Sequence, residues 1–131
     1  MTAATTKTRA GTSPRLRYRQ GTDLELAVKH HLQDNGYYVV KSAGSKGAVD
    51  LVALKRGEVL VIQCKTDGYV PPAERMTFLS LAVSVGATCL VGRWHKEGRA
   101  ARTVAFAELA ATDGGMRPWT PDHGLEVSAG A

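Results

Sequence analysis

This chain lacks long apolar runs, and its cysteines and histidines lack the spacing of a metal or disulfide site. No run approaches the ~20 apolar residues that a membrane-spanning helix needs, and the N-terminus has no apolar segment of the secretory type. The two cysteines, Cys64 and Cys89, lie in apolar stretches without Cys-x-x-Cys spacing. We therefore expect neither a membrane protein nor a zinc protein, and a location in the reducing cytoplasm.

The formal net charge of +5 is unevenly distributed along the 131 residues. Five basic residues precede the first acidic residue, Asp23, and the rest of the chain is electrically balanced. These five residues are Lys7, Arg9, Arg15, Arg17 and Arg19. A separate basic arm is typical of a protein that binds a polyanion, although a solubilising tail would have the same composition.

The order of apolar segments and turn residues predicts one α/β domain. Residues 1–14 are rich in Thr, Ala, Gly and Ser and predict a disordered arm, whereas residues 15–111 predict a folded domain. Residues 112–131 hold two prolines and four glycines and predict an irregular tail. The expected order is α-β-β-β-α-β-β, a mixed five-stranded sheet flanked by helices.

Individual elements follow from periodicity and from start and stop signals. Helices are expected at about Thr22–Asn35, with Thr22 and Glu25 forming a capping box, and at about Pro72–Val85. Strands are expected at Tyr37–Val40, Ala48–Leu54, Val59–Cys64, Ala87–Trp94 and Arg102–Phe106, with a brief helical turn at Ala107–Ala111.

The stretch Ala48–Lys65 (AVDLVALKRGEVLVIQCK) predicts a β-hairpin with its turn at residues 55–58. If the two ends of that turn face each other, Asp50 lies opposite Gln63, and such pairs have Cβ atoms roughly 4.5–5.5 Å apart. Lys65 lies two residues beyond Gln63 and therefore points to the same face. Burying these groups is costly unless they are paired or bound to a metal, so their convergence predicts a functional site.

Structural explanations exist for each of these residues. Glu25 fits the capping box that Thr22 begins, Asp50 could form an ion pair with Lys65 across the hairpin, and Gln63 alone is typical of a hydrogen-bonded core residue. The argument for a site therefore depends on the register that brings Asp50 and Gln63 together.

The order of these residues resembles the PD-(D/E)xK nuclease superfamily. Glu25 on the first helix, then GAVDLVA around Asp50 and VIQCK around Gln63 and Lys65, carry the resemblance. Within this superfamily, residues 15–106 are similar to archaeal-type Holliday junction resolvases. The similar features are the pattern RQGTxxE that ends in Glu25, the Ser- and Gly-rich turn and the size of the chain. The resemblance implies a restriction-endonuclease-like fold.

The resemblance also implies a metal site. Glu25, Asp50, Gln63 and the main-chain carbonyl of Cys64 would hold Mg²⁺, with Mn²⁺ as a substitute. Lys65 would orient the attacking water or stabilise negative charge on the phosphate, so Glu25, Asp50, Gln63 and Lys65 are the candidate catalytic residues. The family has Asp or Glu where this chain has Gln63, a change that puts metal affinity in doubt and that also occurs in Mrr-like restriction nucleases.

Basic and hydroxyl side chains beside these residues are candidates for phosphate contacts. They are Arg15, Arg17, Arg19, Ser42, Ser45 and Lys46, although the serines also suit turn geometry alone. We expect a Mg²⁺-dependent endonuclease that cuts four-way DNA junctions as a homodimer, in the cytoplasm with the nucleoid or, for a viral source, in the host cytoplasm. The alternatives are a Mrr-like or repair nuclease for linear, modified or damaged DNA, and a catalytically silent DNA-binding module.

Overall fold

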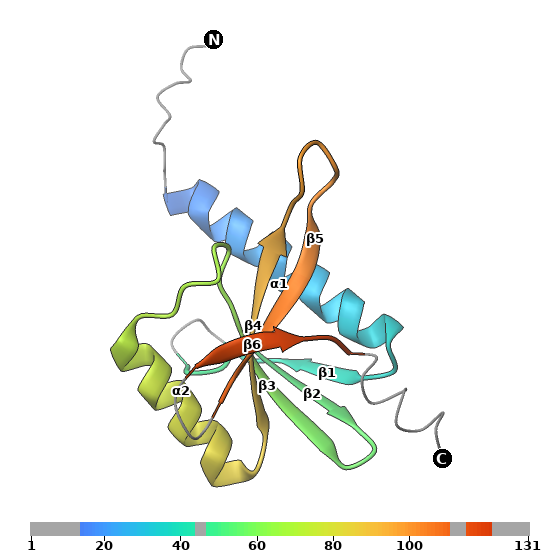
Figure 1. Ribbon diagram of the computed structural model, residues 1–131. Helices are drawn as coiled ribbons and strands as arrows, with labels where there is room; N and C mark the ends of the chain where they lie inside the picture. The colour runs from blue at the N-terminus through green and yellow to red at the C-terminus, as the bar shows by residue number, and fades with distance from the viewer. Residues whose placement is uncertain (1–13, 44–46, 111–114, 122–131) are drawn as a thin grey trace.

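The computed structural model describes residues 14–43, 47–110 and 115–121, with side chains from residue 21 onward (Figure 1). The elements are α1 (Pro14–Asp34), β1 (Tyr38–Lys41), β2 (Leu51–Lys55), β3 (Glu58–Cys64), α2 (Pro72–Val85), β4 (Thr88–His95), β5 (Thr103–Leu109) and β6 (Met116–Trp119). In this part of the chain no helix combines the length and the apolar character that crossing a membrane requires.

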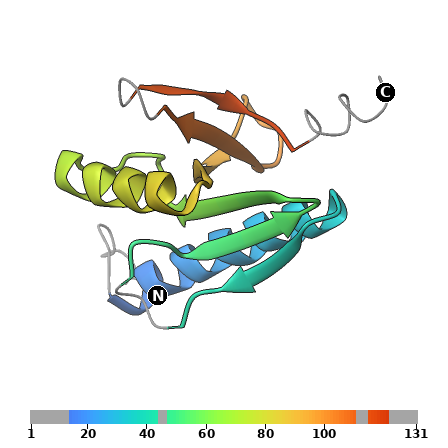
Figure 2. The same cartoon turned by 90° about the horizontal axis from the view of Figure 1, so that it is seen from below.

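The strands form one mixed sheet in sequence order, from β1 to β6. Neighbouring strands are antiparallel except β3 and β4, which are parallel and are joined by α2 as a crossover helix. Helices α1 and α2 lie on opposite faces of the sheet (Figure 2). The α/β class is therefore confirmed, but the sheet has six strands where five were expected.

Helix α1 covers one face through an apolar stripe. Leu24, Val28 and Leu32 recur every four residues, and all three are fully buried against strand residues such as Ile62 and Leu90. The helix begins at Pro14, eight residues before the predicted start, because proline suits the first helical turn and the next residues permit helix. The predicted capping box at Thr22 is therefore wrong, since Thr22 and Glu25 lie inside the helix.

Helix α2 has the predicted bounds and covers the opposite face. Phe78 and Ala82 are buried there with Val61 and Val91 of the sheet. The helix ends at Gly86, which adopts a left-handed φ of 70° and donates its backbone N–H to Val83 at 3.2 Å.

The second difference from the prediction lies after β4. Strand β5 continues to Leu109, so the helical turn expected at Ala107–Ala111 is wrong. The tail expected to be irregular contains β6, which pairs with β5 and packs Trp119 edge-on against Phe106, with ring centroids 5.4 Å apart. Pro118 is compatible with this strand because β6 lies at the edge of the sheet.

The β2–β3 hairpin has the predicted register. Residues Leu51 to Lys55 pair with Ile62 to Glu58 in order. The turn places Arg56 and Gly57 at φ values of 47° and 81°, the pair of positive angles that a two-residue type I′ turn requires. The turn therefore fixes the pairing of residues 51–55 with residues 58–62.

We expect the core beneath α2 to dominate the stability of this face. Phe78→Ala should lower the free energy of unfolding by about 3–5 kcal/mol, because it removes a fully buried aromatic ring. The matched control on the same helix, Met76→Ala, should change it by less than about 0.5 kcal/mol, because Met76 is 73% exposed. Urea denaturation measures both, and similar losses for the two variants would contradict this packing.

Candidate active site

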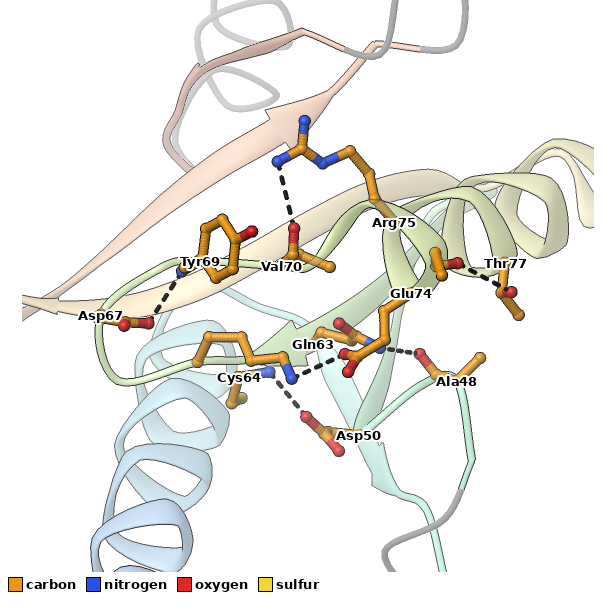
Figure 3. Close-up of polar contacts among 12 residues, drawn as sticks. Ala48, Asp50, Gln63, Cys64, Asp67, Tyr69, Val70, Glu74, Arg75 and Thr77 are labelled. Carbon is orange, nitrogen blue, oxygen red and sulfur yellow. Dashed lines mark hydrogen bonds and ion pairs between the residues drawn. The ribbon is translucent and has the colours of Figure 1, made fainter.

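The β2–β3 ladder ends in a side-chain contact made by Asp50. The backbone N–H of Asp50 donates to the carbonyl of Ile62 at 2.9 Å, so the regular pairing does not extend to Asp50 and Gln63, and the predicted direct pairing of these two residues does not form. Instead, Oδ2 of Asp50 accepts a hydrogen bond from the backbone N–H of Cys64 at 2.8 Å. The carboxylate thereby takes the place of a strand partner and is fixed at the end of β3 (Figure 3).

Gln63 is the one buried polar residue among those that the structure describes, with 7% of its surface exposed. Its Nε2 donates to the carbonyl of Ala48 at 2.8 Å, which orients the amide. Its Oε1 is buried and has no hydrogen-bond partner. Buried acceptors are nearly always paired in folded proteins. A bound cation or water would therefore explain why this oxygen has no partner within the protein.

Lys65 forms an ion pair that the sequence did not predict. Its Nζ donates to Oε1 of Glu74 at 2.9 Å, from the loop after β3 to the first turn of α2 (Figure 3). The structural alternative, an ion pair between Lys65 and Asp50, is not the contact that the structure shows. The sequence predicted that α2 starts at Pro72, which places Glu74 in the first turn of the helix. The distance between Glu74 and Lys65, however, depends on the path of residues 66–71.

These side chains line one open cavity of about 510 Å³. Its lining includes Asp50, Gln63, Lys65 and Glu74, together with Ala48 and Thr77. The alternation of side chains along β3 explains this grouping, because Val61 packs on the α2 side and Gln63 and Lys65 follow it at intervals of two residues. The convergence expected from the hairpin is therefore present.

Glu25 lies apart from this group. It belongs to α1, which covers the opposite face, and its carboxylate pairs with Nζ of Lys41 at 3.4 Å. It lines a separate depression with Lys29 and Leu51. The structure therefore brings together three of the four predicted catalytic residues and places the fourth across the sheet.

Cys64 lies on β3 next to Gln63, and its side chain packs toward α1. Burial raises the pKa of its thiol well above the usual range, and the negative charges of Asp50 and Glu25 raise it further. The thiol is therefore protonated at neutral pH, and its side chain packs on the α1 side and does not line the cavity. Only its main-chain carbonyl suits a hard cation.

The donor atoms at the cavity fit an oxygen-preferring divalent cation. Asp50 and Glu74 supply carboxylates and Gln63 supplies a buried, unpartnered amide oxygen. Within residues 14–43, 47–110 and 115–121, no group of three or more His, Cys, Asp or Glu residues could hold a metal. A metal here would therefore depend on the amide oxygen as well as on carboxylates.

The predicted DNA-contacting residues are described only in part. The backbone N–H of Ser42 donates to the carbonyl of Asp50 at 2.9 Å, which holds that turn beside the site. Arg15, Arg17 and Arg19 belong to the first turns of α1, but their side chains lie outside the described residues, as do Ser45 and Lys46 entirely.

Comparison with known proteins identifies the family. The profile of the archaeal Holliday junction resolvase (Hjc) family matches residues 16–116, which is most of the chain. The chain belongs to the archaeal Holliday junction resolvase family. The expectation from the sequence is thus confirmed, and the match continues through β5 to the start of β6.

Two individual members are similar to this resolvase-family chain. The crossover junction endodeoxyribonuclease Hjc of Methanocaldococcus jannaschii is 50% identical over 52 residues, which are 40% of this chain and only 38% of that protein. The structure of Hjc from Archaeoglobus fulgidus, a Holliday junction resolvase, superposes with a TM-score of 0.52 at 26% identity, covering 66% of this chain and 70% of that chain.

The hydrogen bond from Cys64 to Asp50 predicts unequal effects of two substitutions. Asp50→Ala should lower the free energy of unfolding by about 1 kcal/mol more than Asp50→Asn, because alanine leaves the N–H of Cys64 without an acceptor and asparagine retains one. Both variants lose the same charge, so their difference isolates the hydrogen bond. Chemical denaturation measures this difference, and equal stabilities would contradict the contact.

Proposed function

We propose that this resolvase-family chain is an Mg²⁺-dependent endonuclease that cleaves phosphodiester bonds in four-way DNA junctions. The observation that carries the proposal is the cavity in which Asp50, Gln63 and Lys65 meet. A carboxylate, an amide oxygen and an ammonium group are what phosphodiester hydrolysis needs for binding a hard cation and for balancing charge on the phosphate.

Asp50 and Gln63 would hold the metal, with the main-chain carbonyl of Cys64 as a third donor and Mn²⁺ as a substitute ion. When bound, the ion would lower the pKa of water and polarise the phosphoryl group. Lys65 would orient the attacking water or stabilise the developing negative charge. Asp50 is held in place for this role by the N–H of Cys64.

Glu25 would contribute from the α1 side at the end of β3, directly or through a water molecule. Its pair with Lys41 is partly exposed, with 24% of the Glu25 side chain and 54% of the Lys41 side chain accessible. Such pairs stabilise a protein by at most about 1 kcal/mol, so Glu25 can exchange this partner at little cost.

DNA would lie along the basic start of α1 and the turn before Asp50, with Arg15, Arg17, Arg19, Ser42, Ser45 and Lys46 on its phosphates. Two symmetric cuts in a four-way junction suit a two-fold homodimer. Helix α2 offers a surface for it, because Val83 and Val85 are each more than half exposed.

Two observations favour other functions. Gln63 in place of an acidic residue favours a Mrr-like or repair nuclease, which would cut a linear, modified or damaged duplex as well as a junction. The small number of acidic groups around the cavity favours a silent DNA-binding module, because the described residues contain no cluster of three metal-binding side chains. Such a module would bind DNA in a salt-sensitive manner without nicking it at any Mg²⁺ or Mn²⁺ concentration.

We expect Asp50→Asn and Lys65→Ala each to abolish cleavage of a synthetic four-way junction while junction binding stays largely intact. Removal of divalent cations by chelation should have the same effect on the unmodified protein. The assay uses labelled junction DNA and a matched linear duplex on denaturing gels, with binding measured by gel shift.

Glu97→Gln serves as the matched control, because Glu97 is 85% exposed and lies beyond β4, outside the cavity. Its cleavage rate should equal that of the unmodified protein. Full cleavage by either site variant would refute the assigned site, and equal cutting of the linear duplex would replace the resolvase with the Mrr-like alternative.

A further inference from the structure

The proposed metal site has one negative charge fewer than the family's motif would give it. Where the family's motif has an acidic residue, this chain has the neutral Gln63. Asp50 then supplies one negative charge on that part of the cavity, and Lys65 cancels it. A divalent cation would meet no net negative charge from these three residues, although charge count is a main determinant of affinity at such sites.

A second carboxylate lines the same cavity from α2. Glu74 faces the ammonium group of Lys65, while the cavity also contains Asp50 and Gln63 (Figure 3). With Glu74 included, the four side chains carry one net negative charge. An ionised carboxylate has about four lone-pair positions on its two oxygens, so Glu74 can accept a hydrogen bond from Lys65 and still coordinate a cation.

The loop before α2 fixes Glu74 at this place. Val70 is fully buried, and its carbonyl accepts a hydrogen bond from the guanidinium group of Arg75 at 3.3 Å. Gly68 has a φ of 79°, and a Cβ there would lie 2.7 Å from Cδ of Arg93, so the loop packs closely on β4. The backbone of Glu74 is thus held by a packed segment, and its side chain, which is 49% exposed, reaches Lys65.

A separate observation points to a ligand at the same place. Oε1 of Gln63 is buried and unpartnered, and Gln63 lines the cavity with Glu74. A bound cation or water would supply the partner that this acceptor lacks.

We propose that Glu74 is a carboxylate ligand of the metal site on the α2 side, supplying from α2 the negative charge that Gln63 does not supply from β3. This proposal rests on the metal-dependent function proposed above. It differs from a role in which Glu74 only positions Lys65 through their ion pair.

Mn²⁺ binding in the absence of DNA tests the proposal, with free Mn²⁺ measured by electron paramagnetic resonance. Glu74→Gln should weaken Mn²⁺ affinity about tenfold or more, as expected when a charged ligand is lost. Glu97→Gln should leave it unchanged. The double variant Gln63→Glu with Glu74→Gln should recover most of the affinity, because it moves the charge back to β3.

A double-mutant cycle with Lys65→Ala separates coordination from positioning. In the Lys65→Ala background there is no ion pair to lose, so a weakening by Glu74→Gln that persists there supports coordination by Glu74. A weakening that disappears in that background would overturn the proposal and leave Glu74 as a positioning residue. Circular dichroism confirms that each variant is folded.

The unmodified protein and Asp50→Asn identify which proposal fails. If Mn²⁺ binds and Asp50→Asn weakens it, but Glu74→Gln binds as the unmodified protein does, the role of Glu74 is wrong and the metal site stands. If Asp50→Asn does not weaken Mn²⁺ binding, or if the unmodified protein binds none, the metal site itself is wrong and the inference is overturned with it.

Discussion

The candidate site depends on the hydrogen bond between the carboxylate of Asp50 and the backbone N–H of Cys64. This contact ends the β2–β3 ladder with a side chain in place of a strand partner, so an acidic group is fixed beside Gln63 and Lys65. The aliphatic strands behind it supply the rigidity, because Leu51, Leu60 and Ile62 are almost completely buried. The packed core fixes the position of both strands, and this in turn fixes the position of the carboxylate.

The polar residues near the end of β3 lie on both faces of the sheet. Alternation along β3 turns Gln63 and Lys65 toward α2 and turns Cys64 toward α1. Glu25 on α1 and Glu74 on α2 therefore approach the end of β3 from opposite sides. Burial raises the pKa of the Cys64 thiol at this strand end, and the negative charges of Asp50 and Glu25 raise it further.

Local features of the sequence predicted the hairpin and the second helix because their signals lie within a few residues. Arg56 and Gly57 set the register of the hairpin, and Pro72 and Gly86 bound α2. Strand β6 was missed because its proline and glycine neighbours indicate a loop, while its stability comes from pairing with β5. The pair of Lys65 with Glu74 was missed because it depends on how the intervening loop packs on β4, which no local pattern records.

A motif that is defined along one hairpin counts only the charges on that hairpin. In this chain the motif position after Asp50 is the neutral Gln63, so the motif alone indicates a weakened site. The crossover from β3 to β4 nevertheless returns the chain past the same strand end, and its helix begins there with Glu74. An acidic group at a helix N-terminus is also favoured by the helix dipole. The same electrostatic balance can therefore be reached from a second element, and a substitution in the motif does not by itself imply loss of metal binding.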